Sequence, residues 1–408
     1  MIYKHLYIYN IILYKMKRFF TYDWQEDTTN DEYTLIRIYG INELNESVCV
    51  VIDNFTPYVY AELPTDACKW NSSLAQLLCN KIDEVCGKQK PIKKSLMFKK
   101  KLYYANINKK TTAYKKFPFL FLAFSSRSDI NYFIYKSRYQ FIVSGIGNIK
   151  IKIHEQDAST ILQLTSLKDL PTSGWIGFKG KESFDENKET LCDHEYRVNW
   201  KNMQKLDNID DVVEPLVMGF DIEVNSVNTK AMPKPANPGD KIFQISCVFQ
   251  RGNNDENLEK YLLTLGEPNQ KIIGNDVEIH IFDTEADLLL GYTSLIIERN
   301  PQVIIGYNIL NFDIPYMIER AKLYYIIDSF NLQSFVIGKH AEEMTIKWSS
   351  AAYKNQEFTF LNSEGRLFID LLPVVRRDYK FSKYNLKTVA DFFLGETKDP
   401  LTPQGIFK

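Results

Sequence analysis

The stretch Leu216–Val224, LVMGFDIEV, determines the fold class of the region around it. Its apolar and β-branched residues are typical of a buried strand. Side chains alternate along a strand, so Phe220 and Ile222 should lie on one face and Asp221 and Glu223 on the other. The sequence therefore predicts two carboxylates on the same side of one strand.

Two neighbouring carboxylates in an apolar setting repel each other and lose hydration unless a cation neutralises them. Oxygen ligands of this kind suit magnesium or manganese. We therefore interpret Asp221 and Glu223 as candidate metal ligands. The alternative is a strand end whose two acids simply reach water.

A second acidic motif, GYNILNFDIPY, spans Gly306–Tyr316. It indicates a strand that runs into the start of a helix, which places Asp313 near a helix N-terminus, where a carboxylate is favoured. Asn308 and Phe312 lie beside it. The alternative is that Asp313 is an ordinary first-turn charge before Pro315, a residue suited to a helix start.

Strand and helix patterns alternate around these motifs. Thr284 and Asp287 form a helix-capping pattern, and a further helix should begin near Asn311. This alternation predicts an α/β fold with a mixed sheet. The other expected elements are the strands KIFQISCVF (241–249), YLLTLGE (261–267), EIHIF (278–282), VIIGY (303–307) and RLFID (366–370), and the helix YNLKTVADFFLG (384–395).

The region before residue 200 has a different pattern of expected secondary structure. Residues 33–63 read as a β meander, and residues 118–166 as mixed α and β. A polar, acidic stretch at 202–215 marks a boundary, which predicts a β-rich amino-terminal domain (16–200) and a second domain (201–408). Residues 1–15 are expected to be an upstream extension of a chain that starts at Met16. Their lysine-flanked apolar run is too short to span a membrane, and no other segment could do so.

The segment Lys88–Lys116 contains eleven lysines, no acid and interleaved aromatic residues. This composition is expected of a surface that follows a phosphate backbone while rings meet bases. The alternative is a solvated hairpin edge protected by lysines. With 50 basic and 51 acidic residues the formal charge is −1, so any affinity for nucleic acid must be local. The six cysteines include no C-x-x-C pair, which argues against zinc modules and disulfides and favours a reducing compartment.

The two acidic motifs together resemble the first and second exonuclease motifs of family B DNA polymerases, especially the delta-type and large-DNA-virus enzymes. The sequence similarity to this family continues in DKIFQIS (240–246), in NPQVIIGYNILNFDIPYMIERA (300–321) and upstream in IRIYGINELNESVCVVIDNFTPYVYAEL (36–63). The similarity covers residues 20–408. It implies a β-rich amino-terminal domain followed by a ribonuclease-H-like 3′–5′ exonuclease domain.

The resemblance also implies roles for individual residues. Asp221, Glu223 and Asp313 would hold two divalent ions, Mg²⁺ or Mn²⁺, about 4 Å apart, for phosphodiester hydrolysis. Asn308 and Phe312 would grip the frayed primer end. The implied partners are primer–template DNA with its single-stranded 3′ end, a separately encoded palm and thumb half, and a sliding clamp. The implied setting is DNA replication at an intracellular site, either a viral replication site or the nucleus.

The chain also departs from the family. A third motif, Tyr-x-x-x-Asp, is expected beyond the FFLGE-type helix, and the chain ends at Lys408 before any such motif. The match Tyr324–Asp328 follows Asp313 too closely and is interpreted as a coincidence. Asp370 and Asp391 are acids in the right region but in the wrong context. We therefore expect the isolated chain to be weakly active or inactive as an exonuclease.

The palm motifs Asp-x-x-Ser-Leu-Tyr-Pro and Tyr-Gly-Asp-Thr-Asp do not occur in the sequence, so no nucleotide addition is expected from this chain alone. Three interpretations follow: a fragment of an interrupted polymerase gene, one half of a split enzyme, or an independent nuclease. A different class of function also stays open. In it the chain is a non-catalytic module that binds DNA or a partner subunit.

Overall fold

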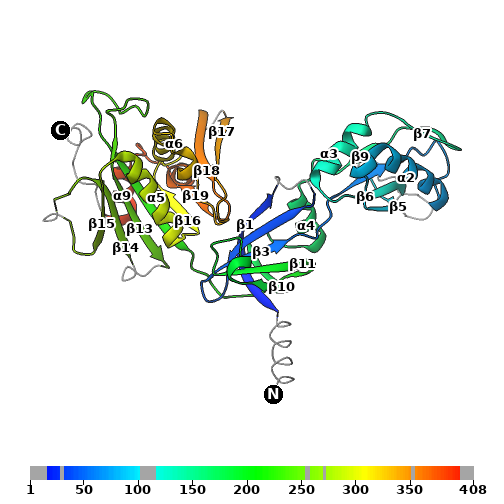
Figure 1. The fold of residues 1–408 in the computed structure, drawn as a ribbon, viewed down its shortest axis with the longest axis horizontal. Coiled ribbons are helices and arrows are strands. Elements are labelled where there is room, and N and C mark those ends of the chain that lie inside the picture. The colour runs from blue at the N-terminus through cyan, green and yellow to red at the C-terminus, as the bar shows by residue number, and fades with distance from the viewer. Residues whose placement is uncertain are drawn as a thin grey trace, which may run out of the picture. The chain divides into compact units, whose positions relative to one another are not determined.

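The computed structural model describes residues 16–27, 32–101, 116–252, 258–269, 273–350 and 354–395, which form two compact units (Figure 1). Unit 1 contains the described residues within 1–40, 49–183 and 195–210, and unit 2 those within 41–48, 184–194 and 211–408. The expected upstream extension, 1–15, lies outside the described residues. In the described part of the chain, no helix combines the length and the apolar character needed to cross a bilayer. The domain limits 16–200 and 201–408 stay a prediction.

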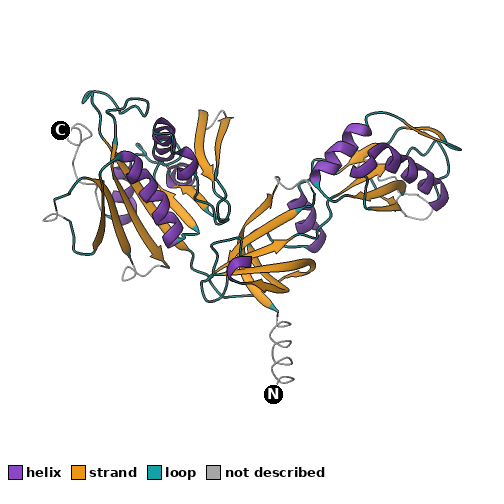
Figure 2. Cartoon of the chain, in the orientation of Figure 1, coloured by secondary structure: helices purple, strands orange, loops and turns teal. Residues whose placement is uncertain are grey.

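Unit 1 contains a closed β-barrel with the strand order β1-β10-β11-β3-β2. It is built almost entirely of strands (Figure 2). β2 and β3 are buried along their whole lengths, which explains their continuous apolar sequences. A side chain at Gly40 would lie 2.4 Å from the carbonyl oxygen of Phe20, so a glycine is needed there. The strands are β1 (Lys17–Asp27), β2 (Leu35–Ile41), β3 (Ser47–Ile52), β10 (Gly174–Ser183) and β11 (His194–Lys205).

A second sheet of unit 1 has the order β5-β6-β4-β9. Val59 and Ala61 of β4 pack with Leu120 and Leu122 of β6 in a core shared with helices α2 and α3. Within residues 33–63, β2 and β3 are neighbours in the barrel, as the predicted meander requires, and β4 joins this second sheet instead. The elements are β4 (Tyr58–Glu62), α2 (Ser72–Cys86), β5 (Lys93–Lys99), β6 (Phe117–Ala123), α3 (Arg127–Lys136), β7 (Phe141–Val143), β8 (Gly147–Ile149), β9 (Lys152–His154) and α4 (Thr160–Lys168).

Two segments that come early in the chain belong to unit 2. At the tip of the β2–β3 hairpin, the side-chain oxygen of Asn45 accepts a hydrogen bond from the backbone N–H of Glu214 (2.8 Å). In the connection between β10 and β11, the N–H of Leu191 donates to the carbonyl of Phe335 (2.8 Å). Unit 2 is therefore completed by segments 41–48 and 184–194.

Unit 2 is organised around a mixed sheet with the order β15-β14-β13-β12-β16-β19. β12 pairs antiparallel with β13 and parallel with β16, and β16 pairs parallel with β19. The predicted α/β fold with a mixed sheet is thus confirmed. The strands are β12 (Leu216–Val224), β13 (Ile242–Arg251), β14 (Glu259–Leu265), β15 (Val277–Phe282), β16 (Val303–Gly306) and β19 (Leu367–Asp370).

Helices and a hairpin complete unit 2. Apolar residues of α5 and α6 form one core with the inward face of β12 and β13 (Figure 1). α5 begins as predicted, because the side chain of Thr284 caps it by accepting from the N–H of Asp287. These elements are α5 (Glu285–Arg299), α6 (Asp313–Leu323), α7 (Ile327–Phe330), β17 (Glu342–Ser350), β18 (Lys354–Asn362), α8 (Leu371–Asp378) and α9 (Leu386–Leu394).

Candidate active site

The first acidic motif lies on β12, in the middle of the sheet. Phe220 and Ile222 are buried in the core, and Asp221 and Glu223 point to the opposite face, as the alternation predicts. Asp221 is exposed, so the expectation that both acids sit in an apolar setting is wrong for this residue. Asp221 reaches water, as the alternative interpretation states, and its neighbour on the same face, Gly219, has no side chain to cover it.

Asp313 of the second motif lies against the same strand. Of β12, β16 pairs with residues 217–219, and β16 ends at Gly306, so within the described residues the edge of β12 beyond this point has no strand partner on that side. Asp313, the first residue of α6, takes that place: its Oδ1 accepts the backbone N–H of Ile222 (3.2 Å). Ile222 stands between Asp221 and Glu223, so the structure brings Asp313 beside the residue that separates the two acids of β12.

The electrostatics of Asp313 follow from this position. Its side chain is only 3% exposed. Burial, together with the nearby charge of Asp221, raises the pKa of Asp313 to about 7, although the N–H of Ile222 lowers it in part. A bound cation would favour the ionised form of this carboxyl group, because its positive charge offsets the repulsion from the neighbouring carboxylate.

The loop between β16 and α6 carries Asn308 and Phe312. A Cβ on Gly306 would lie 3.0 Å from the carbonyl oxygen of Phe220, so only glycine fits where the chain leaves β16. Asn308 then adopts a left-handed conformation (φ +69°), and its carbonyl accepts the N–H groups of Asn311 and Phe312. Phe312 is half-buried, with its ring 5.6 Å from that of Tyr316. Asn308 and Phe312 thus lie in the turn that leads directly into Asp313.

Asp370, an acid that the sequence placed in the wrong context, is connected to this loop. It is the last residue of β19 and is 5% exposed. Its carboxylate accepts the backbone N–H groups of Asn308 (2.8 Å) and Leu310 (3.1 Å). One sequence signal could have indicated this role: aspartate is a preferred N-cap residue, and Asp370 precedes the helix α8, which was not predicted from the sequence. The parallel register with β16 could not be read from the sequence.

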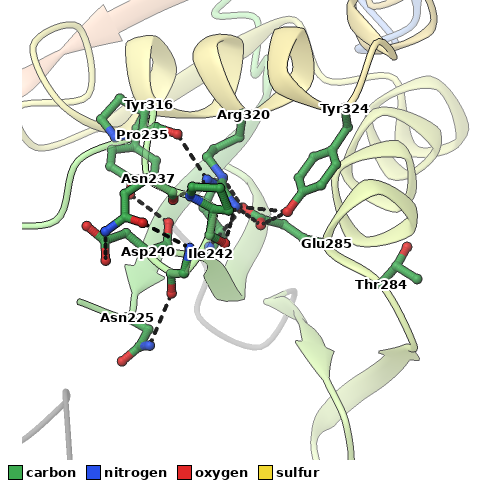
Figure 3. Close-up of polar contacts among 12 residues, drawn as sticks. Asn225, Pro235, Asn237, Asp240, Ile242, Thr284, Glu285, Tyr316, Arg320 and Tyr324 are labelled. Atoms are coloured by element: carbon green, nitrogen blue, oxygen red, sulfur yellow. Dashed lines mark hydrogen bonds and ion pairs between the residues drawn. The ribbon is translucent and has the colours of Figure 1, made fainter. Parts of the chain in front are cut away.

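The segment that follows the first motif is held by a buried network (Figure 3). The guanidinium of Arg320, which is fully buried, donates through Nε to Glu285 (2.8 Å) and through Nη1 to the carbonyls of Pro235 (2.9 Å) and Asn237 (2.8 Å). The Tyr324 hydroxyl donates to the same Glu285 (2.7 Å). Arg320 therefore joins α5 and α6 to the connection between β12 and β13.

The remaining acids raised by the sequence lie elsewhere. Tyr324 belongs to the Arg320 network, and Asp328 is an exposed residue of α7. Asp391 is exposed on α9. Among the residues that the structure describes, no group of three or more His, Cys, Asp or Glu side chains is arranged to hold a metal ion. The donor chemistry of Asp221, Glu223 and Asp313 nevertheless fits a hard divalent cation, because all three offer carboxylate oxygens and Asp313 is hard to ionise without one.

Comparison with known proteins identifies the family. Residues 151–389, more than half of the chain, match the family described as DNA polymerase family B, exonuclease domain. The chain belongs to the family B DNA polymerases. The resemblance seen in the two acidic motifs is thereby confirmed.

Several family B polymerases are similar along most of this chain. The DNA polymerase 120R of Invertebrate iridescent virus 3 is 41% identical over 96% of this chain, but over only 35% of its own length. The DNA polymerase delta catalytic subunit of Schizosaccharomyces pombe is 25% identical over 92% of this chain and 34% of its own length. The chain thus spans about a third of the length of the curated relatives it matches.

A solved structure agrees in fold. The family B DNA polymerase of the archaeon Pyrobaculum calidifontis superposes with a TM-score of 0.61, covering 96% of this chain and 42% of its own, at 17% sequence identity. At that identity the likeness concerns the fold alone. It extends over both units of this family B polymerase chain, each with its own sheets.

Proposed function

We propose that this chain supplies the 3′–5′ proofreading part of a family B DNA polymerase, and that unit 2 removes nucleotides from a DNA 3′ end during replication. The observation that carries the proposal is the contact between Asp313 and the backbone N–H of Ile222, the residue that separates Asp221 from Glu223 in the sequence. The family match over residues 151–389 supports the same reading. A ribonuclease-H-like architecture for unit 2 is part of this proposal.

In this proposal Asp221, Glu223 and Asp313 hold two divalent ions, Mg²⁺ or Mn²⁺. When bound, such ions offset the charge of the phosphodiester and lower the pKa of a water molecule. The residues of the chain do the rest. Asn308 and Phe312 orient the last nucleotides of the strand, the ring stacking on a base. A mismatched end reaches the site more often, because it costs less free energy to unpair.

The partners follow from the proposed role. The substrate is primer–template DNA whose 3′ end has become single-stranded. A palm and thumb half and a sliding clamp are the proposed protein partners. A viral replication site is the proposed setting, supported by the relatives in iridescent viruses.

The test is degradation of a 5′-labelled single strand in the presence of Mg²⁺, with the chain in excess over DNA. Because the chain is expected to be weakly active at most, we expect only slow stepwise shortening from the 3′ end. We expect Asp221→Ala and Glu223→Ala each to reduce its rate about a hundredfold or more. Asp391→Ala is the matched control, since it removes an exposed acid of the same unit, and it should leave the rate unchanged. Cleavage that survives both substitutions on β12 would contradict the proposal.

A second candidate function, strand binding without catalysis, is favoured by one face of the β5-β6-β4-β9 sheet. Opposite the buried residues of β4, the rings of Tyr58, Tyr60 and Phe121 form a cluster with centroids 5.2–5.6 Å apart. The Lys99 ammonium lies 3.6 Å from the ring centre of Tyr60. Rings combined with lysines suit bases and phosphates.

The basic segment 88–116 supplies Lys99, and its residues 102–115 lie outside the described part of the chain. β5 is an edge strand, as the alternative interpretation of this segment requires. The two interpretations therefore need a binding experiment. We expect Tyr60→Ala to weaken binding of a single-stranded oligonucleotide about tenfold, because one stacking contact is lost.

Tyr135→Ala, an exposed tyrosine of α3, is the control for that measurement and should bind as the unsubstituted chain does. Fluorescence anisotropy at two salt concentrations measures both effects. Equal affinities of the two variants would remove this face as a candidate. Strand binding that depends on Tyr60, with no cleavage by any version of the chain, would favour the non-catalytic module over the nuclease.

A further inference from the structure

Asp370 stands where two parallel strands end together. β16 and β19 pair in register, with Gly306 opposite Asp370. The chain leaves β16 at Gly306 and forms the loop 307–312. The side chain of Asp370 therefore lies beside that loop. It is 5% exposed, so its carboxylate must find its partners within the protein.

Those partners are all backbone N–H groups. Oδ1 accepts from Asn308 (2.8 Å) and Leu372 (2.9 Å), and Oδ2 accepts from Leu310 (3.1 Å). Hydrogen bonds to an ionised acceptor are about twice as strong as those between neutral groups. Two of the three bonds go to the loop, and only the bond from Leu372 belongs to the helix α8 that Asp370 caps.

The loop needs this support because of its backbone. Asn308 has a φ of +69°, in the left-handed region, which asparagine adopts more readily than most residues but which still benefits from fixed hydrogen bonds around it. The carbonyl of Leu310 in turn accepts the N–H of Thr359 on β18 (3.0 Å). Leu310 is thus held on both sides, by Asp370 through its N–H and by β18 through its carbonyl.

We propose that Asp370 is a positioning residue of the exonuclease site: it fixes the turn at Asn308 and thereby sets where Phe312 and Asp313 lie. Asp370 acts through the backbone of the loop and contacts neither DNA nor metal. The inference rests on the proposed nuclease function. The simpler role, an N-cap for α8, accounts for the bond from Leu372 but not for the two bonds from the loop.

Asp370→Asn separates the two roles. Asparagine is as good an N-cap as aspartate, so α8 keeps its cap. Its one acceptor oxygen can keep the bonds that Oδ1 accepts from Leu372 and Asn308, and its amide group turns a donor toward the N–H of Leu310, which needs an acceptor. In the full chain we expect KM for a single-stranded oligonucleotide to rise at least tenfold with a smaller change in kcat, because the loop carries the residues proposed to grip the strand.

Thr284→Ala is the matched control, because it removes the N-cap of another helix of unit 2, α5, whose cap bond is made with Asp287. It should lower the melting temperature more than Asp370→Asn does and leave KM unchanged. A second readout is amide hydrogen exchange followed by NMR. In Asp370→Asn the amide of Leu310, which loses its acceptor Oδ2, should exchange at least tenfold faster, and those of Asn308 and Leu372, which share the retained Oδ1, should keep more of their protection.

A wild-type KM together with unchanged exchange at Leu310 would overturn the inference. A rise in KM of equal size in Thr284→Ala would also overturn it, since the effect would then be general destabilisation. Absence of any Asp221-dependent cleavage by the unsubstituted chain would count against the proposed function instead. The exchange rates would then decide by themselves whether Asp370 holds the loop.

Discussion

Replacing Arg320 by Met is expected to lower the free energy of unfolding by about 3–5 kcal/mol, the range for removing one partner of a buried ion pair. The side chains of Arg320 and Glu285 are 0% and 1% exposed. Methionine would leave the carboxylate of Glu285 buried without its cation, and the carbonyls of Pro235 and Asn237 would lose their donor. Urea unfolding followed by circular dichroism measures the effect.

Two further variants make this expectation specific. Lys322→Met alters the same helix α6, but Lys322 is 40% exposed and its ion pairs are at the surface, so a change within about 0.5 kcal/mol is expected. The double variant Arg320→Met with Glu285→Gln removes both charges and should recover part of the loss, because no buried charge is left unpaired. Equal stability of Arg320→Met and Lys322→Met would show that the network is not important for stability.

Asp313→Asn is expected to stabilise the fold at pH 8 by about 3–4 kcal/mol and to have little effect at pH 4. The folded state raises the pKa of Asp313 from 3.8 to about 7, so it binds a proton that the unfolded chain has released. Stability from this group is therefore present at low pH and is lost as the pH rises from about 4 through 7. Asparagine keeps the oxygen that accepts from Ile222 and carries no charge.

The measurement is thermal unfolding of both proteins across this pH range. Asp328→Asn, an exposed aspartate of α7, is the control and should follow the unsubstituted chain at every pH. Excess Mg²⁺ at pH 8 should stabilise the unsubstituted chain and not Asp313→Asn, because a cation replaces the missing proton. A difference in stability between the two proteins that does not depend on pH would mean that the pKa of Asp313 is not raised by folding.

The sequence predicted local structure well where its apolar residues followed one clear repeat, such as the alternation of a strand. LVMGFDIEV alternates cleanly, and the strand β12 with its two faces follows from that pattern alone. Thr284 and Asp287 likewise marked the start of α5, because capping depends only on neighbouring residues. The exposure of Asp221 agrees with the alternative interpretation, in which the acids of this strand reach water, and the local pattern did not decide between the two.

Long-range features stayed beyond prediction because they depend on which strands become neighbours. Nothing local in residues 58–62 indicates that β4 leaves the path of β2 and β3 for another sheet. The role of Asp370 requires the parallel register between β16 and β19, which joins residues far apart in the chain. Arg320 similarly looks like an ordinary helix charge in the sequence, and only the folded connection at 235–238 makes it the centre of a network.

The two early segments that complete unit 2 affect how the molecule can be dissected. No single cut in the polypeptide separates the nuclease unit from the barrel, because residues 41–48 and 184–194 would stay on the other piece. A truncated clone beginning near residue 211 would expose the backbone of Glu214 and Phe335 where Asn45 and Leu191 now bond. A recombinant form of unit 2 would need residues 41–48 and 184–194 added as separate peptides or fused to it in a circularly permuted sequence.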